Sequence, residues 1–509
     1  MNVTSEKISN KNRIFFLTFI LVLLVILQFY SREYIYFRDH AWFWDGILRI
    51  NSGETLYKDF GVPVGPVSFY LNAYLSKIFG TNALSFHFAQ IIQSTLILFF
   101  SMSILNTLEK KFSLVIWGGF FCAFLYLIFL WFPWYNSTAA LFFIASIFFY
   151  LNHSKYSLYL TGASVALAIL SKHDIGILAL FTIITIFIHE KFVLNKINIT
   201  LSKFLLQFFF GIGLVIFLML IFFDWQNLLY WINFGDDDKG NRLMSLTTLF
   251  RRPGIYISMI LYFISLRNKS FPLLIYSMIA VSASISTITS GLSHTHFYYL
   301  FIVPAVFFHL LRLRLNYLIW TPILFFGLLS ILFPIGRGYF VLENIVLDKY
   351  DHFHFNHRKN HINNISMIDL GVCVKEFRNV HVPDSICQLT NELKTKYPND
   401  NGKILNFSEL TFLPHILGMK NIIGQPLWYH TGVTFYEKER NALINALNEG
   451  TYDLIIFQPN RVPSGFPIEL ITHNDKYELS TNRFITPTKI TKKDQNCNDC
   501  YVTYYSRKN

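Results

Sequence analysis

Residues 14–30 read IFFLTFILVLLVILQFY, and a short link leads from them to FRDHAWFWD at 37–45. The first stretch is an apolar run close to the length of about 20 residues that a helix needs to cross a bilayer core of roughly 30 Å. It is longer than the apolar core of a signal peptide, and no small-residue cleavage site follows it. We therefore expect a retained membrane anchor with a charged, aromatic segment directly behind it.

Apolar runs of similar length continue along the chain and predict about eleven membrane-spanning helices. Hydrophobic residues make up 53% of the 509 residues and charged residues only 15%, against about 25% in soluble domains. This composition excludes a soluble enzyme, a disordered chain and a coiled coil. After the first run, spans are expected near 88–105, 113–131, 136–151, 157–170, 175–189, 204–223, 254–266, 271–289, 297–311 and 316–334.

The distribution of basic residues predicts how these helices are oriented. With a cytoplasmic N-terminus, the inner segments hold 13 Lys or Arg in about 47 residues, and the outer segments hold 10 in about 102 residues. An odd number of spans then places the C-terminal region outside the cytoplasm. The net charge of +12 is explained by this topology, because no basic patch interleaved with aromatics predicts a nucleic-acid partner.

Two domains follow from the change in composition near residue 335. Residues 1–335 form the expected membrane domain, with a first outer loop at 31–87 whose aromatic, amphipathic sequence suits helices in the membrane interface. Residues 336–509 gain Asn, Asp, Lys and Pro. Strand-like runs at 403–407 and 452–457 flank a helical pattern at 437–449, which predicts a small extracytoplasmic α/β domain.

The cysteines of this C-terminal region suggest disulfides. Cys373, Cys387, Cys497 and Cys500 would all lie in an oxidising compartment, which favours two disulfides with three possible pairings. The alternatives are free or mixed thiols and a zinc site built from Cys497, Cys500 and two further ligands.

The acidic residues behind the first run are the candidate catalytic groups. Asp39 lies at the end of a rigid span among aromatic residues that can exclude water and raise its pKa, as a general base requires. The alternative is a carboxylate solvated at a helix end. Asp45 lies about 600° further round a helix, so the two carboxylates would not share a face. Asp45 and Asp59 are second candidates.

The order of these features resembles the GT-C superfamily of membrane glycosyltransferases. The similarity covers roughly residues 14–334. One departure is His40 after Asp39, where many relatives carry a second acidic residue. The residues that carry the resemblance are Asp39, Gly53, Tyr57, Asp59, Phe60, Gly65, Pro66, Tyr70, the SKHDIG segment at 171–176, the SHTHFYYL segment at 293–300 and Pro304.

The resemblance implies transfer of a sugar from a polyprenyl-phosphate donor to an acceptor hydroxyl, with inversion, at the outer face of a membrane, most simply a bacterial inner membrane. The acceptor would be a glycan, a lipid or a protein. Asp39 would be the base, cations would hold the donor phosphate, and Trp42 and Trp44 would stack on sugar; headgroup contacts and an interfacial belt are the alternatives. The candidate phosphate-binding residues are Lys172, Arg251, Arg252, His294 and His296.

No metal ligands are assigned, and a divalent cofactor such as Mg²⁺ or Mn²⁺ is left open. Two other functions are the alternatives. An envelope polysaccharide polymerase or ligase would place its large outer loop between late spans, and a lipid-linked sugar transporter would show repeats and charges within the membrane. The acidic first loop favours the glycosyltransferase.

Overall fold

The computed structural model forms two compact units, which we describe separately. The helical unit comprises Met1–Ser31, Ala89–Phe222 and Leu243–Glu343, and the mixed unit comprises Arg32–Phe88, Phe223–Arg242 and Asn344–Asn509. The residues whose structure is described are 10–30, 39–109, 111–129, 133–195, 199–223, 225–232, 253–290, 367–378, 381–398, 401–408, 410–429, 434–458, 462–463, 465–484 and 501–508.

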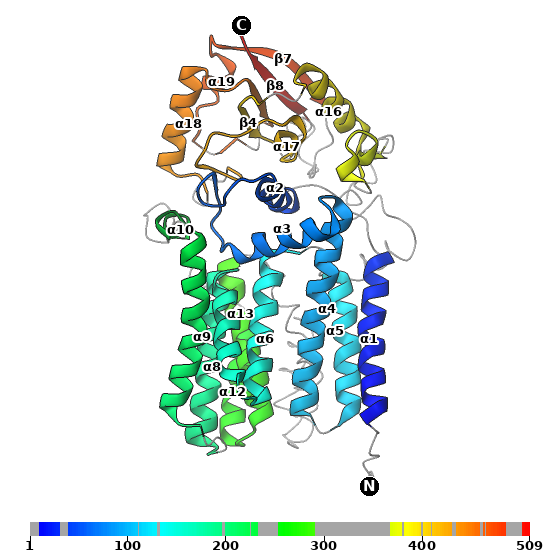
Figure 1. Ribbon diagram of the computed structural model, residues 1–509, viewed down its shortest axis with the longest axis vertical. Coiled ribbons are helices and arrows are strands. Elements are labelled where there is room, and N and C mark those ends of the chain that lie inside the picture. The colour runs from blue at the N-terminus through cyan, green and yellow to red at the C-terminus, as the bar shows by residue number, and fades with distance from the viewer. Residues whose placement is uncertain are drawn as a thin grey trace. The chain divides into compact units, whose positions relative to one another are not determined.

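Helices in the helical unit coincide with the apolar runs expected from the sequence between residues 14 and 289 (Figure 1). The last two expected spans, 297–311 and 316–334, lie outside the described residues. The helices are α1 (Asn10–Tyr30), α4 (Ala83–Leu108, whose first turn belongs to the mixed unit), α5 (Phe112–Phe129), α6 (Tyr135–Asn152), α7 (Ser157–Ile169), α8 (His173–Ile188) with a π-helical turn (His189–Val193), α9 (Leu201–Phe222), α12 (Pro253–Arg267) and α13 (Phe271–Ser290).

The helical unit has the surface of a membrane protein. Three of the described helices are long and apolar enough to cross a bilayer, namely Leu84–Leu108, His173–Val193 and Leu201–Phe222. Large apolar side chains stand exposed on α9, among them Leu206 at 72% and Phe222 at 73%. Such a surface is stable against lipid tails rather than water.

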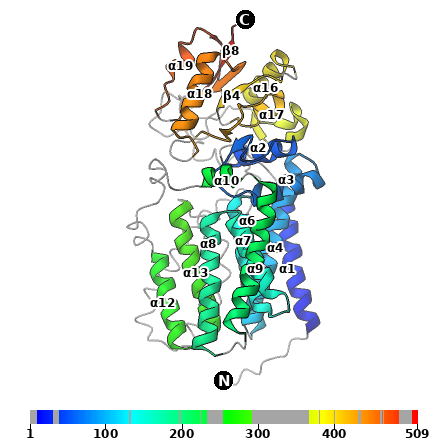
Figure 2. The same ribbon diagram turned by 60° about the vertical axis from the view of Figure 1, so that its left-hand side comes forward.

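Small residues let α7 and α9 pack closely. A β-carbon added at Gly162 would overlap the carbonyl oxygen of Phe208, and one added at Gly211 would overlap that of Tyr159. The backbones therefore approach each other at these two glycines, which is the usual basis of tight helix pairing in membranes. Helices α12, α13 and α8 also run side by side in both views (Figure 2).

Two buried acids in the helical unit are paired with tyrosines. The Tyr150 hydroxyl donates to Glu190 at 2.8 Å, and the Tyr276 hydroxyl donates to Glu109 at 2.7 Å. The first pair joins α6 to the π-helical turn after α8, and the second joins α13 to the residue that follows α4. Because a buried carboxyl is costly without a hydrogen-bond donor, these tyrosines stabilise the packing of their helices.

A four-stranded sheet forms the centre of the C-terminal part of the mixed unit. Its order is β4 (Ile404–Phe407), β6 (Leu454–Phe457), β8 (Tyr501–Arg507) and β7 (Tyr477–Phe484), with β4 and β6 parallel and the other pairs antiparallel. Helix α18 (Glu437–Glu449) lies in the connection between the two parallel strands, as a parallel pair requires. Strands β4 and β6 and helix α18 fall at the positions that the sequence predicts.

The remaining elements of the mixed unit surround this sheet and include the first outer loop. The loop contains two helices, as its amphipathic sequence suggests. The elements are α2 (Asp39–Asn51), β1 (Phe60–Gly61), α3 (Val67–Phe79), α10 (Trp225–Ile232), β2 (Met367–Asp369), the 3₁₀ turns Leu370–Val372 and Lys375–Phe377, β3 (His381–Pro383), α16 (Asp384–Lys396), α17 (Leu413–Leu417), β5 (Gln425–Pro426) and α19 (Glu469–Thr472).

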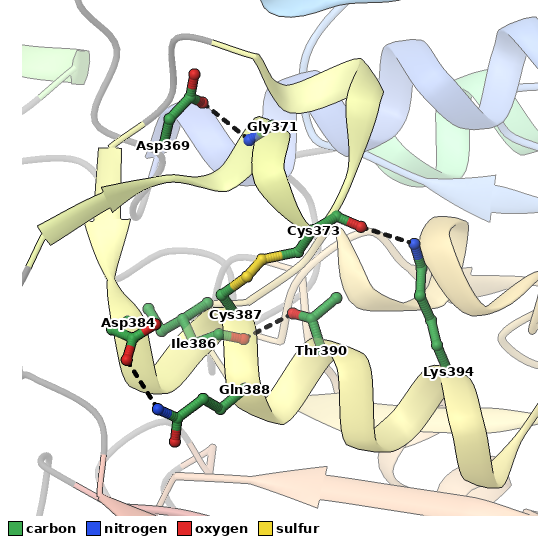
Figure 3. The surroundings of a disulfide bond; sticks show 9 residues. All are labelled: Asp369, Gly371, Cys373, Asp384, Ile386, Cys387, Gln388, Thr390 and Lys394. Carbon is green, nitrogen blue, oxygen red and sulfur yellow. Dashed lines mark hydrogen bonds between the residues drawn. A yellow bond between two sulfur atoms is a disulfide. The ribbon is translucent and has the colours of Figure 1, made fainter.

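A disulfide between Cys373 and Cys387 ties the 3₁₀ turn that follows β2 to the first turn of α16 (Figure 3). Their Cα atoms are 5.8 Å apart, within the usual range for a disulfide. The Lys394 ammonium donates to the Cys373 carbonyl at 3.1 Å and adds a second tie from the same helix. Cys497 and Cys500 lie outside the described residues.

The first outer loop packs with the C-terminal part of the mixed unit. Strand β1 pairs with β5 in parallel, and the Trp42 indole stacks on the Trp428 indole with ring centroids 3.8 Å apart. These contacts explain why the compact units divide the chain differently from the composition boundary at 335. The site residues expected in the first loop therefore share a unit with residues near the end of the chain.

Candidate functional site

Helix α2 positions two of the acidic candidates. It begins at Asp39, and residues 42–50 are all buried. The structure describes the Asp39 backbone but not its side chain. A carboxylate at the first residue of a helix is favoured in its ionised form by the helix dipole.

Asp45 lies at the buried end of a pocket. Its side chain is 3% exposed, and its Oδ1 atom has no hydrogen-bond partner among the described residues. Burial raises the pKa of this carboxyl from 3.8 to about 7, while the Arg49 guanidinium lowers it and Glu54 raises it further. Asp45 can therefore exchange a proton near neutral pH.

Arg49 lies one turn beyond Asp45 on the same face of α2. Its Nε and Nη2 atoms contact the Glu54 Oε2 atom at 2.8 and 2.6 Å, and its guanidinium lies 4.3 Å from the centre of the Phe60 ring. The Nη1 atom has no hydrogen-bond partner in the described part of the chain. Glu54 and Phe60 therefore hold Arg49 in place.

The pocket has a volume of about 180 Å³ and brings the end of α2 together with the segment between α17 and β5. Ser52, Gly418 and Lys420 are exposed and mark its open side, whereas Asp45 and Arg49 form its buried end. Its lining residues are Asp45, Arg49, Ser52, Glu54, Pro414, His415, Gly418, Met419, Lys420 and Asn421.

His415 contributes a neutral imidazole to this pocket. Burial lowers the pKa of His415 below its ordinary 6.5, although Glu376 and Glu54 act in the opposite direction. At neutral pH the ring can donate from one nitrogen and accept at the other. The lining also contains two acidic residues, Asp45 and Glu54, and two basic residues, Arg49 and Lys420. The pocket is therefore polar with little net charge.

Asp59 and its neighbours shape the turn that leads into β1. The backbone N–H of Thr55 donates to the Asp59 carboxylate at 2.6 Å, which gives this acid a structural role in the turn. Tyr57 has a φ of 70°, and its hydroxyl donates to the Val64 carbonyl at 2.5 Å. The motif residues of this segment therefore fix a strained turn next to Phe60, the ring that supports Arg49.

The two candidate sugar-stacking residues are buried in aromatic packing. Trp42 stacks on Trp428, and Trp44 stacks on Phe86 with centroids 5.5 Å apart and contacts Phe377 at 4.7 Å. Their side chains are 5% and 4% exposed. A sugar could stack on either indole only after these contacts opened.

Lys172 occupies the short turn between α7 and α8 in the helical unit, where the sequence predicts a turn. Its Nζ atom lies 3.0 Å from the Asp174 carboxylate, and both side chains are under 10% exposed, at 7% and 9%. A donor phosphate would have to share Lys172 with Asp174. The other predicted phosphate ligands, Arg251, Arg252, His294 and His296, lie outside the described residues.

The structure brings together residues that the sequence did not single out. Arg49 and Glu54 carry a local signal, because Arg49 follows Asp45 at helical spacing and Glu54 comes soon after. His415 and Asn421 come from the far end of the chain, and nothing in their local sequence points to α2. Within the described ranges, no group of three or more His, Cys, Asp or Glu side chains could hold a metal ion.

Comparison with solved structures identifies the fold. ArnT from Cupriavidus metallidurans bound to undecaprenyl phosphate aligns over 96% of this chain and 97% of its own, with a TM-score of 0.54 and 11% identity. The chain has the GT-C fold. The apo state of the same protein aligns equally fully, with a TM-score of 0.55 and 11% identity.

The chain has a weaker likeness to a second solved protein. An apo oligosaccharyltransferase from Archaeoglobus fulgidus aligns over 68% of this chain and 58% of its own, with a TM-score of 0.42 and 14% identity. No family model matches the sequence, and a search of curated proteins gives no match.

Proposed function

We propose that this protein is an integral-membrane glycosyltransferase. It transfers a sugar from a polyprenyl-phosphate donor to an acceptor hydroxyl on the extracytoplasmic face, with inversion at the anomeric carbon. The observation that carries the proposal is the likeness to ArnT over nearly the whole of both chains, since that protein was solved with undecaprenyl phosphate bound. The distribution of Lys and Arg supports the orientation, with the N-terminus in the cytoplasm.

The chemistry needs a base for the acceptor hydroxyl and cations for the leaving phosphate. Asp39 is the proposed base, because it follows the first span after a short link and is the first residue of α2. As the hydroxyl oxygen forms a bond to the anomeric carbon, its proton passes to Asp39. The bond from that carbon to the phosphate oxygen breaks, and the polyprenyl phosphate leaves as an anion.

Stabilisation of that anion falls to the cations proposed to lie on the outer face. Lys172, Arg251, Arg252, His294 and His296 are assigned this role. Lys172 would lie between the phosphate and Asp174, and the carboxylate would then orient the ammonium. Lys172→Ala should weaken donor binding as well as turnover, whereas loss of a base affects turnover alone.

Asp45 is the second candidate for the base. Its pKa of about 7 suits proton transfer near neutrality, and the residue belongs to the lining of a pocket. Substitution of each acid separately by Asn decides between them, because loss of the true base lowers the catalytic constant at saturating donor and acceptor.

The test is mass spectrometry of envelope glycans and lipid-linked sugars from a strain that lacks the protein. We expect a polyprenyl-phosphate sugar to accumulate and one sugar to be missing from a cell-envelope product. Re-expression of the natural sequence should reverse both changes. Unchanged lipid-linked sugars together with unchanged glycans would contradict the proposal, and accumulation of the donor on the cytoplasmic face alone would favour a transporter.

A further inference from the structure

Helix α10 begins close to the end of a helix that is long and apolar enough to cross a bilayer. Helix α9 ends at Phe222 and α10 begins at Trp225, three residues further along the chain. Three residues span at most about 11 Å, so the start of α10 stays near the point where α9 leaves the bilayer. The last turn of α9 is still apolar, with Ile221 and Phe222 61% and 73% exposed. Helix α10 therefore begins at the boundary between lipid and water.

Large apolar side chains of α10 are exposed on one side of this helix. Trp225 and Leu229 lie about one turn apart, on the same side, and are 52% and 54% exposed. Tryptophan is the residue that favours the headgroup level of a bilayer, and an exposed leucine beside it suits the ends of the acyl chains. This pair has the composition of a helix that lies in the membrane interface.

A different residue of α10 attaches this helix to α18. The Tyr230 hydroxyl donates to Glu439 Oε1 at 2.6 Å, and the Lys438 ammonium lies 4.6 Å from the centre of the Tyr230 ring. Glu439 is 3% exposed, and its Oε2 atom accepts the backbone N–H of Tyr436 at 3.2 Å. One buried carboxyl group thus caps α18 and holds α10. The tie fixes how α10 is turned and leaves Trp225 and Leu229 exposed.

The first outer loop holds the link that precedes α10. The Phe223 ring packs edge-on against the rings of Tyr70 and Tyr57, with centroids 5.0 and 6.3 Å apart. Aromatic pairs in this geometry add to the stability that their burial provides. Helix α10 is therefore fixed to the mixed unit at both ends, through Phe223 and through Tyr230.

Helix α3 also exposes apolar side chains and lies close in sequence to a helix that can cross the bilayer. It ends at Phe79, and the span that starts at Leu84 follows five residues later, at most about 18 Å away. Tyr74 and Ile78 lie one turn apart on α3 and are 64% and 57% exposed. The mixed unit thus has two helices that each expose an apolar pair next to a span. A phospholipid surface is the partner that the chain itself brings to both.

We propose that the mixed unit docks on the phospholipid surface of the bilayer through α10 and α3, with Trp225 and Leu229 inserted at the boundary between headgroups and acyl chains. The hydrogen bond from Tyr230 to Glu439 joins α10 to α18 and so holds the α/β part of the unit at the membrane surface. This docking is independent of whether the protein transfers a sugar.

Photo-crosslinking to lipid tests the docking directly. The full-length protein would carry benzoylphenylalanine at position 225 or position 229, in nanodiscs of phosphatidylcholine and phosphatidylglycerol. Both positions are exposed, so the larger side chain can be accommodated. After illumination, mass spectrometry should find phospholipid adducts at each position, because an interfacial helix buries its apolar face about 5–10 Å into the headgroup and acyl boundary.

The matched control carries benzoylphenylalanine at Asn445, an exposed position on α18. It should give no lipid adduct. Adducts at positions 225 and 229 to a second copy of the chain, or no lipid adduct at either position, would overturn the docking on lipid. Equal lipid adducts at positions 225 and 445 would overturn the role of this helix face.

Tyr230→Phe tests the tie between α10 and α18. A hydrogen bond to a charged group is worth enough that its loss should speed amide hydrogen exchange in α10 by about 10-fold or more. Tyr397→Phe, at a half-buried position after α16, is the control and should leave exchange in α10 unchanged. Equal exchange in Tyr230→Phe and the natural sequence would overturn the role of the tie.

Discussion

Asp45 of the mixed unit and the two buried acids Glu109 and Glu190 of the helical unit have different surroundings. Glu109 and Glu190, which are 7% and 4% exposed, accept hydrogen bonds from Tyr276 and Tyr150 at 2.7 and 2.8 Å. Asp45 is equally buried and belongs to the lining of a pocket, and its Oδ1 atom has no hydrogen-bond partner among the described residues. A buried carboxyl that accepts a hydrogen bond from a tyrosine costs less in folding than one whose oxygen has no donor.

Each unit also holds a buried ion pair. In the helical unit, Lys172 is paired with Asp174. In the mixed unit, Arg49 is paired with Glu54 and its guanidinium lies over the Phe60 ring.

Asp39→Asn should produce the largest effect, and it tests whether the acids of α2 serve catalysis. A general base contributes a factor of roughly 10² to 10⁴ in rate, so turnover should fall at least about 10²-fold while expression and donor binding stay close to normal. The measurement is transfer at saturating donor. Asp475→Asn is the matched control, since Asp475 is exposed and outside the pocket.

Retention of more than about a third of the natural rate by Asp39→Asn would contradict the role of base, against the 10²-fold loss expected. Asp45 would then be the better candidate. Asp59 would remain a residue of the turn, because its carboxylate accepts the Thr55 backbone N–H.

Asp45→Asn should stabilise the protein at alkaline pH. Because the folded pKa is raised from 3.8 to about 7, the ionised carboxyl opposes folding above pH 7, and this penalty disappears as pH falls towards 4. The difference corresponds to about 4 kcal/mol at 1.36 kcal/mol per pKa unit. We expect a higher unfolding temperature for Asp45→Asn than for the natural sequence at pH 8, with the gain shrinking towards pH 4.5.

Asp475→Asn, the same change at an exposed site, should leave the unfolding temperature unaltered at both pH values. A gain for Asp45→Asn that is equal at pH 8 and pH 4.5 would show that the carboxyl is not the source of the stabilisation.

Loss of the disulfide should destabilise the mixed unit and leave the helical unit intact. A bridge between Cys373 and Cys387 closes a loop with a sequence separation of 14 residues, which is worth about 3 kcal/mol. Cys387→Ser should lower the unfolding temperature of the C-terminal part, and reducing agent should then have no further effect through this bridge.

Alkylation of the non-reduced protein followed by mass spectrometry should find Cys373, Cys387, Cys497 and Cys500 unlabelled, and full labelling of all four would contradict oxidation in pairs.

Tyr276→Phe should give the smallest of these effects and the opposite sign to Asp45→Asn. It removes the donor to Glu109 and leaves that buried acid with one hydrogen bond fewer, which costs about 1.5–3 kcal/mol. Tyr262→Phe, at a half-buried position on α12, is the matched control. Equal unfolding temperatures for Tyr276→Phe and Tyr262→Phe would remove the distinction between paired and open acids.

The helices could be predicted from sequence because bilayer length and apolar content determine them locally. Helix α9 at Leu201–Phe222 matches the expected span at 204–223, and the turn before His173 lies inside the predicted SKHDIG segment.

The site could be predicted only in part. Asp45 was a second candidate, but His415 and Asn421 reach it through the two-residue pairing of β1 with β5, which leaves no local pattern.

Transfer by the purified protein tests the central claim most directly. Membranes from the strain lacking the protein supply the unused lipid-linked sugar and the unmodified acceptor, and purified protein in nanodiscs is added to their extract. We predict that the natural sequence consumes the polyprenyl-phosphate sugar and attaches it to the acceptor with inverted anomeric configuration, and that Asp39→Asn does neither. A folded natural protein that leaves the lipid-linked sugar unconsumed in the presence of that acceptor would contradict the account.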